Sequence, residues 1–308
     1  MRYDRENRQI DKITREYFVK TIETQSKINL IASLCIFGTI SLFVRNIALG
    51  SGMIALSRGV LGASFLLLYL ALRKQKLDLP AIRSNFWILL LSGGVMGLNW
   101  ALLFEAYRYT TVATATLCYY MQPVFLTLAA TVVLREKLGV KKGLCVLVAL
   151  CGMVLISGVI GGEPPEAGEL RGIALGLGAA CFYACVILCN KKLRDIGAFD
   201  KTIVQLLAAA AVMVPYCALT GERITAETFQ PASLACLLVL GMFHTGFAYA
   251  LYFGSMKALR AQTIAIFSYM DPVIAILISV TILHEPFTIY SALGSVLILG
   301  AAFVSEKS

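Results

Sequence analysis

Charged residues are scarce in this sequence. Only 15% of its 308 residues are charged and 58% are hydrophobic, whereas soluble domains have about 25% charged and about 45–50% apolar residues. The sequence therefore lacks the polar surface that a soluble protein of this length needs. No polar stretch is longer than the N-terminal 27 residues, so we expect no separate soluble domain.

Signatures of metal, nucleotide and disulfide chemistry are also missing. The chain has two histidines, and none of its nine cysteines forms a Cys-x-x-Cys pair, so we predict no metal site and no disulfide framework. Its glycine runs carry no Lys-Ser/Thr of a phosphate-binding loop, so we expect neither ATP binding nor another cofactor. We also find no N-terminal signal peptide.

Long apolar runs dominate the rest of the chain. A membrane-spanning helix needs about 20 mostly apolar residues, and that length divides the sequence into ten segments. They cover residues 28–48, 53–72, 86–105, 112–133, 143–160, 172–190, 202–219, 233–253, 261–283 and 287–305. We therefore predict an all-α integral membrane protein with ten transmembrane helices.

The basic residues alternate between the predicted sides of the membrane. With the N-terminus inside, 22 Lys and Arg fall in inside segments and four fall outside, at Arg45, Arg108, Arg171 and Arg223. This bias predicts a multi-pass protein of the plasma membrane with both termini cytoplasmic. The net charge of +9 is thus divided among the loops, which argues against a nucleic-acid partner.

The sequence repeats itself after a shift of 149 residues. Tyr120-Met121 aligns with Tyr269-Met270, Pro123-Val124 with Pro272-Val273, and Glu136 with Glu285. Each half contains five predicted spans, an odd number, so the halves must lie in the membrane in opposite orientations. Glu136 is then expected inside and Glu285 outside.

The repeat sets the expected domain organisation. We predict a first repeat over residues 28–160, an extracellular linker over 161–171 that contains Gly161 to Pro165, and a second repeat over 172–305. Residues 1–27 read equally well as a cytoplasmic tail or as an interfacial helix, and residues 306–308 form a short cytoplasmic tail.

The repeated motifs resemble a known family. Residues 120–124 (YMQPV) and 134–138 (LREKL) recur as residues 269–273 (YMDPV) and 283–287 (LHEPF). This pattern is similar to EamA-like members of the drug/metabolite transporter superfamily, from about residue 28 to residue 305. The resemblance implies two five-helix halves around a central cavity and transport by alternating access. Members of the family move amino acids, nucleotide sugars, polyamines, choline and drugs, so the motifs do not define the substrate.

Two prolines are predicted to interrupt spans at equivalent depths. Pro123 and Pro272 each remove a backbone donor, which leaves the carbonyls of Tyr119 and Ser268 without their usual helical partners. The kinks are therefore candidates for a conformational switch, with backbone acceptors exposed to a cavity.

Ionisable and strongly polar side chains inside spans are candidate site residues, because each costs about 2.5–3.5 kcal/mol at mid-helix unless it is paired or faces water. Asp271 precedes Pro272, and its symmetry partner Gln122 precedes Pro123. Asp271 is a candidate substrate contact or proton carrier. The alternative for Asp271 is a packing role, bonded to neighbouring polar groups.

Two basic side chains also fall inside spans. Arg58 could bind a carboxylate or phosphate in a bidentate manner, form an ion pair between the halves, or extend to the outer interface. His244 could titrate near physiological pH if it contacts water, or it could be a hydrogen-bonded structural residue.

A set of aromatic and amide side chains completes the candidates for a binding site. It comprises residues that all lie within predicted spans: Asn99, Trp100, Tyr119, Tyr120, Tyr183, Tyr249 and Tyr269. Aromatic residues in membranes more often contact lipid or other helices. If they line a cavity with one carboxylate, however, they suit a cationic or zwitterionic solute through cation–π contacts.

The leading hypothesis is a secondary carrier for a small organic metabolite, such as an amino acid, a cationic or zwitterionic solute, or a drug. Export is the commoner direction among EamA-like relatives; protons are the candidate coupling ion, and a homodimer is the candidate assembly. The alternatives are a flippase or passive pore for a lipid-linked or polar solute, and an integral membrane transferase. The transferase needs clustered Asp or His at one interface, which this sequence does not offer.

Overall fold

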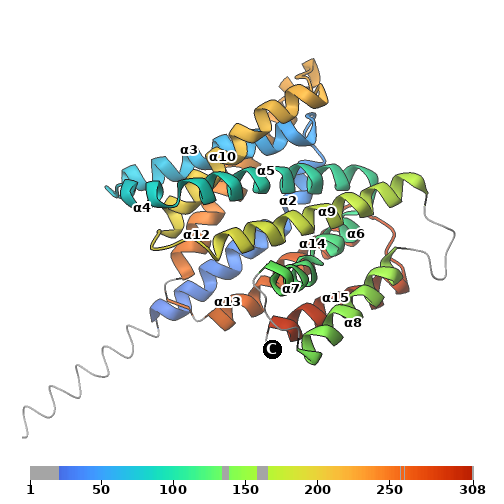
Figure 1. Cartoon of the computed structure of the whole chain (residues 1–308). Coiled ribbons are helices and arrows are strands. Elements are labelled where there is room, and N and C mark those ends of the chain that lie inside the picture. Colours follow the sequence, from blue (N-terminus) through green and yellow to red (C-terminus); the bar gives the residue numbers. More distant parts are fainter. Residues whose placement is uncertain (1–20, 134–138, 158–165, 257, 260, 307–308) are drawn as a thin grey trace, which may run out of the picture.

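The computed structural model describes residues 21–133, 139–157, 166–256, 258–259 and 261–306. All regular structure in these ranges is helical, and Figure 1 shows the long helices packed into one bundle. Within the same ranges, seven helices are long and apolar enough to cross a membrane, and shorter apolar helices cover residues 266–281 and 289–305. Leu72, Trp87 and Leu219 are 75%, 76% and 88% exposed on the outside of the bundle. An outer surface this apolar is the kind that faces lipid.

The first half contains five crossings in chain order. These are the helical segment Thr21–Val44, with a turn at Thr39 before α2 (Ile40–Val44); α3 (Ser51–Leu72); α5 (Phe86–Tyr109); α6 (Val112–Tyr119) continued by α7 (Gln122–Val133); and α8 (Val140–Ile156). A short helix, α4 (Leu79–Ser84), joins α3 to α5; Asp78 caps its start and Pro80 lies in its first turn.

The second half contains the five corresponding crossings. These are α9 (Ala167–Asn190); α10 (Ala198–Thr220); α11 (Pro231–Leu238) continued by the π-helix η2 (Val239–Phe247) and α12 (Ala248–Met256); α13 (Ala261–Ser268) with α14 (Met270–Thr281); and α15 (Ile289–Glu306). A 3-10 turn, η1 (Ala226–Phe229), precedes α11. Each of the ten predicted spans thus corresponds to one of these ten helical segments, seven of which are long and apolar enough to cross a membrane.

The helix of the first crossing already includes residues 21–27, which the hydropathy pattern leaves outside the predicted span. Glu23 and Lys27 form an ion pair of 2.8 Å one turn apart, and Gln25 donates a hydrogen bond to Asn29. Such pairs stabilise a polar helical turn, so the helix extends beyond its apolar part. Three predictions concern residues outside the described ranges: the N-terminal tail or interfacial helix (residues 1–20), the start of the linker (residues 161–165) and the inside position of Glu136.

Helices related by the 149-residue shift make equivalent contacts. Helix α10 packs against α5, and its counterpart α3 packs against η2, which occupies the place of α5 in the second half. Helix α3 also contacts α10, and α8 contacts α15. Counterpart helices begin at opposite ends of the bundle, which is the inverted repeat that the odd number of spans predicts.

The two proline-containing crossings are broken at equivalent positions. The break between α6 and α7 falls at Tyr120 and Met121, and the break between α13 and α14 falls at Tyr269. Pro123 and Pro272 then occupy the first turns of α7 and α14, where a missing backbone donor costs nothing. The regular helix is thus interrupted by one or two residues just before each proline.

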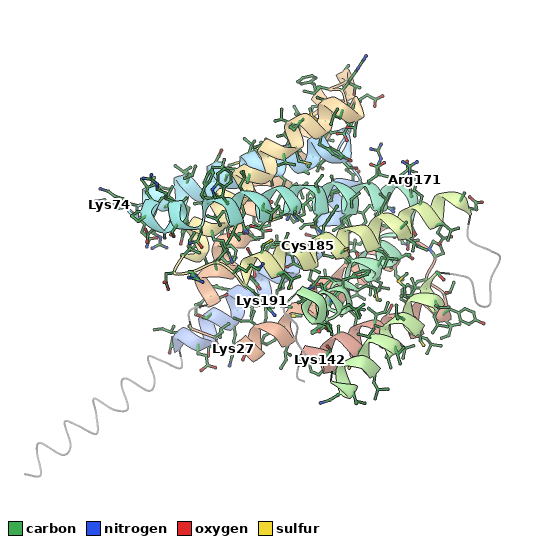
Figure 2. The ribbon with its side chains drawn as sticks, in the orientation of Figure 1. Lys27, Lys74, Lys142, Arg171, Cys185 and Lys191 are labelled. Atoms are coloured by element: carbon green, nitrogen blue, oxygen red, sulfur yellow. The ribbon has the colours of Figure 1, made fainter. Side chains whose placement is uncertain are left out.

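The bundle has two distinguishable ends. The lysine end, as we call it, contains Lys142, Lys191 and Lys201, where α8 and α10 begin and α9 finishes. The opposite Arg45 end contains Arg45, where the first crossing finishes. Figure 2 shows Arg171, near the start of α9, at the upper right of the molecule, and Lys191 nearer the centre and Lys142 at the lower edge, both away from it.

Candidate functional site

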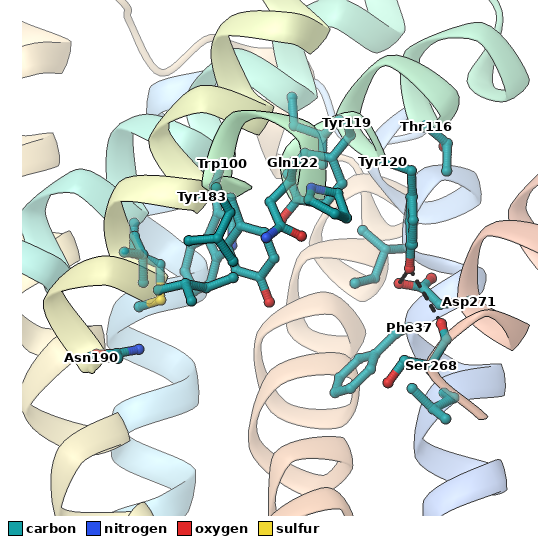
Figure 3. Close-up of a pocket in the computed structure, with 18 of the residues that line it drawn as sticks. Phe37, Trp100, Thr116, Tyr119, Tyr120, Gln122, Tyr183, Asn190, Ser268 and Asp271 are labelled. Atoms are coloured by element: carbon teal, nitrogen blue, oxygen red, sulfur yellow. Dashed lines mark hydrogen bonds between the residues drawn. The ribbon is translucent and has the colours of Figure 1, made fainter. Parts of the chain in front are cut away.

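A cavity of about 770 Å³ lies between the two halves. Helices of both repeats line it, including the broken crossings α6–α7 and α13–α14 (Figure 3). The lining reaches the helix ends at the lysine end, where Lys191 is exposed. In the other direction it stops at Ser41 and Tyr107, which are buried. The cavity is therefore accessible from the lysine end and blocked toward the Arg45 end.

An ionic network closes the Arg45 end. Arg45 forms an ion pair with Glu285, and its guanidinium donates hydrogen bonds of 2.9 Å and 3.0 Å to the carbonyls of Tyr107 and Thr110. Glu285 in turn accepts a 2.8 Å hydrogen bond from the backbone N–H of Val112 at the start of α6. Charge-assisted bonds of this kind are stronger than neutral ones, so they hold the first crossing, the α5–α6 connection and the segment after α14 together.

Asp271 lies where the two broken crossings meet. It occupies the first turn of α14 and lines the cavity. The Tyr120 hydroxyl donates a 3.1 Å hydrogen bond to its carboxylate and also lies 3.4 Å from the carbonyl oxygen of Ser268, the carbonyl that Pro272 deprives of its helical partner. Figure 3 shows Gln122 in the same cavity as Asp271. The break in one half is thus bonded to the break in the other.

Arg58 is a buried cation at the cavity wall. Its side chain is 4% exposed and lines the cavity, its Nε donates a 2.7 Å hydrogen bond to Thr245 Oγ1, and its guanidinium carbon lies 4.2 Å from the centre of the Trp100 ring. Within the described part of the chain it forms no ion pair with a carboxylate. Arg58 on α3 therefore connects to η2 of the other half through the Thr245 hydroxyl, and its guanidinium borders the cavity.

Tyrosines cover much of the remaining wall. Tyr119 stacks on Tyr183 with ring centres 5.4 Å apart, and Tyr120 packs edge-on against Tyr119 at 6.1 Å. Tyr249 also lines the cavity. Tyr269 lines it as well and packs edge-on against Phe303 at 5.7 Å. This wall can receive an apolar or aromatic group and offers hydroxyls to a polar one.

Two predicted candidates lie outside the cavity lining. His244 is 1% exposed and sits in η2, with its ring nitrogens 2.8 Å from the Thr39 hydroxyl and 3.2 Å from the Val239 carbonyl. Asn99 is fully buried and donates a 2.5 Å hydrogen bond to the Ala179 carbonyl. Both side chains therefore form hydrogen bonds to a neighbouring helix and do not reach the cavity, while the Oδ1 of Asn99 is buried without a hydrogen-bond partner.

Sequence reasoning missed three basic residues of the cavity. Lys142, Lys191 and Lys201 line it at the lysine end, together with Gln205, which donates hydrogen bonds to Ser92 and Asn190. In the sequence these lysines are only basic residues near the ends of spans, which indicate the membrane orientation and not a position in a cavity. The repeated Leu-x-Glu motif marks Glu285 but gives no indication of its partner Arg45.

Comparisons with known proteins agree with this architecture. The model of the EamA-like transporter family matches residues 26–158 and again residues 170–306. The uncharacterized transporter YxxF of Bacillus subtilis (strain 168) is 27% identical over 88% of this chain and 86% of its own length. Protein RarD of Salmonella typhi is 26% identical over 65% of each chain.

A solved structure, described only as "Crystal structure of protein", shares the fold with a TM-score of 0.63. It is 19% identical and covers 91% of this chain and 98% of its own. The two family matches together span most of the sequence, one for each half. The chain is therefore a multi-pass membrane transporter that belongs to the EamA-like transporter family of the drug/metabolite transporter superfamily.

Proposed function

We propose that this protein is a secondary carrier that moves a small organic solute across the plasma membrane by alternating access. The observation that carries the proposal is the cavity between the inverted halves, accessible from the lysine end and closed at the Arg45 end by the Arg45–Glu285 ion pair. Carriers built from inverted repeats hold their substrate between the halves and open to one side at a time.

The distribution of basic residues supports an orientation with the lysine end and both termini in the cytoplasm. In that orientation the structure is an inward-open state, ready to load a cytoplasmic solute. Export is then the expected direction, as is common among EamA-like relatives.

Asp271 is the candidate coupling residue. As a carboxylate it accepts the Tyr120 hydrogen bond that joins the two broken crossings. Protonation would weaken this bond, because a neutral carboxyl is a poorer acceptor. A proton gradient could in this way change the relative stability of the inward- and outward-open states.

A passive pore fits the geometry less well, because the cavity is closed at one end. A flippase needs a side opening to lipid, whereas the described lining residues lead to the helix ends at the lysine end. Organic solutes such as amino acids and other zwitterions or cations, and a homodimer as the assembly, remain as predicted from the sequence.

Counterflow in proteoliposomes tests the carrier function. Vesicles are loaded with a defined mixture of amino acids, organic acids, amines and nucleosides, and exchange with external labelled compounds is followed by mass spectrometry. We expect exchange of at least one compound and its accumulation under an imposed pH gradient. Complete absence of exchange would reject the carrier, while exchange without any response to pH would reject only proton coupling.

Asp271→Asn distinguishes substrate exchange from proton coupling, since it keeps the shape of the side chain and removes its charge. The variant should retain counterflow and lose accumulation driven by the pH gradient. Asp195→Asn, at an exposed position in the α9–α10 connection, is the matched control and should behave as wild type.

A further inference from the structure

The charges of the cavity lining are strongly unbalanced. Arg58, Lys142, Lys191 and Lys201 come from four different parts of the fold, whereas Asp271 is the single carboxylate among the described lining residues. We propose that the substrate carries an anionic group, a carboxylate or phosphate, that the three lysines attract into the cavity and Arg58 binds. The proposal rests on the carrier function of the same cavity and narrows its substrate class.

The guanidinium of Arg58 has unused capacity for an anion. Its Nε donates a hydrogen bond to Thr245, and the guanidinium lies over the ring of Trp100. None of the described carboxylates forms an ion pair with it, although the residue is only 4% exposed, and Asp271 is the one carboxylate that shares the cavity lining with it. A buried cation without an anionic partner is costly, and guanidinium binds planar oxyanions through two parallel hydrogen bonds. An anionic substrate group would therefore supply the missing partner.

The three lysines form a collar where the cavity meets the lysine end. Lys142 lies in the first turn of α8, Lys191 follows the last residue of α9, and Lys201 lies in the first turns of α10. None of the three forms an ion pair with a described carboxylate. The neighbouring Asp200 accepts a hydrogen bond from the backbone of Asp78 and is not part of the lining. Clefts with one sign of charge concentrate ions of the opposite sign and speed their entry.

The excess of basic residues in the cavity lining changes the expected substrate class. The aromatic residues alone suggest a cationic or zwitterionic solute. Tyr119, Tyr183 and Asp271 can receive an ammonium group, so a zwitterion fits the cavity. A cation without an acidic group would meet the lysine collar and Arg58 and gain only one carboxylate. The cavity thus selects for acids and zwitterions against simple amines.

Ligands that share one scaffold and differ in charge test the substrate class. Wild-type protein is assayed by counterflow with 3-phenylpropionate, phenylalanine and 2-phenylethylamine, and the same comparison is applied to every compound of the defined mixture that exchanges. We expect the exchanged compounds to carry a carboxylate or phosphate. In Arg58→Gln, the concentration of these compounds that half-saturates exchange should rise at least tenfold. Exchange of an amine that lacks an acidic group would overturn the proposal while leaving the carrier function intact.

Adjacent lysines provide a matched control for the collar. Lys142→Gln/Lys191→Gln removes two lining charges, whereas Lys141→Gln/Lys192→Gln removes two charges from the neighbouring positions, which do not line the cavity. The first pair should lower the initial rate of the exchanged acid several-fold at low ionic strength and flatten its dependence on salt. Equal effects of the two pairs, or no effect of the first, would show that the collar does not attract the substrate.

Discussion

Arg45 and Glu285 form an ion pair that connects the end of the first crossing to the segment after α14. The side chains are 29% and 9% exposed, and the hydroxyl of Ser279 also donates to the Glu285 carboxylate. Because Arg45 also donates to the backbone carbonyls of Tyr107 and Thr110 at the C-terminal end of α5, one side chain holds three segments together. The cavity can open at the Arg45 end only if these contacts break.

Replacing Arg45 should therefore favour the state that is open at this end. Arg45→Gln removes the ion pair and weakens both bonds to the α5–α6 connection. A change of about 1.4 kcal/mol in the balance between two states alters their ratio tenfold. The readout is labelling of a cysteine introduced at Ser41, which lines the cavity and is 2% exposed. A membrane-impermeant maleimide, added on the side of the Arg45 end, should react several times faster in the variant.

Labelling of the native cysteines is measured as background in the same protein without the Ser41→Cys change. Arg108→Gln is the matched substitution, because Arg108 lies at the same end, is 58% exposed and approaches Glu105 only to 3.8 Å. Exposed pairs of this kind contribute little, so its labelling rate should equal wild type. The exchanged pair Arg45→Glu/Glu285→Arg should recover only part of the closure, since glutamate cannot donate to the Tyr107 carbonyl. Unchanged labelling in Arg45→Gln would show that the ion pair does not close the cavity.

The bond between the two broken crossings gives a second prediction. Tyr120→Phe keeps the ring and removes the hydroxyl that donates to Asp271. A hydrogen bond to a charged group is worth about 1.5–3 kcal/mol, so the link between the halves should weaken without loss of the fold. We expect reduced accumulation under a pH gradient with counterflow retained. Tyr183→Phe, which changes a cavity tyrosine with no recorded bond to Asp271, serves as the control; an equal loss in both variants would contradict the specific role of Tyr120.

The orientation of Arg58 depends on Thr245. The Thr245 hydroxyl accepts from Arg58 Nε and donates to the Leu240 carbonyl five residues earlier, within the π-helix. Thr245→Val has nearly the same shape but leaves the buried Nε without an acceptor, so substrate affinity should fall about tenfold. Thr245→Ser keeps the hydroxyl and should remain within about twofold of wild type. The measurement is the half-saturation of counterflow, and equal affinity in the two variants would exclude a positioning role.

The bilayer explains why the fold could be predicted from sequence. A spanning helix must be apolar over its whole length, so each crossing is visible as a run, and the repeat of Pro123 at Pro272 shows where two crossings break. Because each span is apolar on all sides, the sequence does not show which face of a helix borders the cavity. Arg58 and His244 are both basic residues inside spans, yet one faces the cavity and the other connects two helices.

Contacts at the helix ends were hidden for a different reason. Lys142 and Lys191 resemble the other loop lysines in sequence, and only the arrangement of α8 and α9 brings them to the cavity. Arg45 and Glu285 lie in opposite halves, so no local pattern relates them. Long-range pairing of this type follows from tertiary packing and cannot be read from spacing.

A close approach of two backbones gives the last prediction. Gly38 lies in the first crossing, and a Cβ added there would be 2.7 Å from Ile274 Cβ and 2.9 Å from the carbonyl oxygen of Asp271. The backbone cannot yield as a flexible side chain can, so Gly38→Ala must displace α14 and should destabilise the protein by about 1–3 kcal/mol. Gly300 in α15 has no such neighbour within 4 Å, and Gly300→Ala should stabilise by about 0.5–1 kcal/mol through helix propensity. Thermal unfolding in detergent should thus show shifts of opposite sign, and because Gly38→Ala also moves Asp271, it alone should reduce counterflow. If both variants were stabilised equally, the first crossing and α14 could not lie as close as the structure places them.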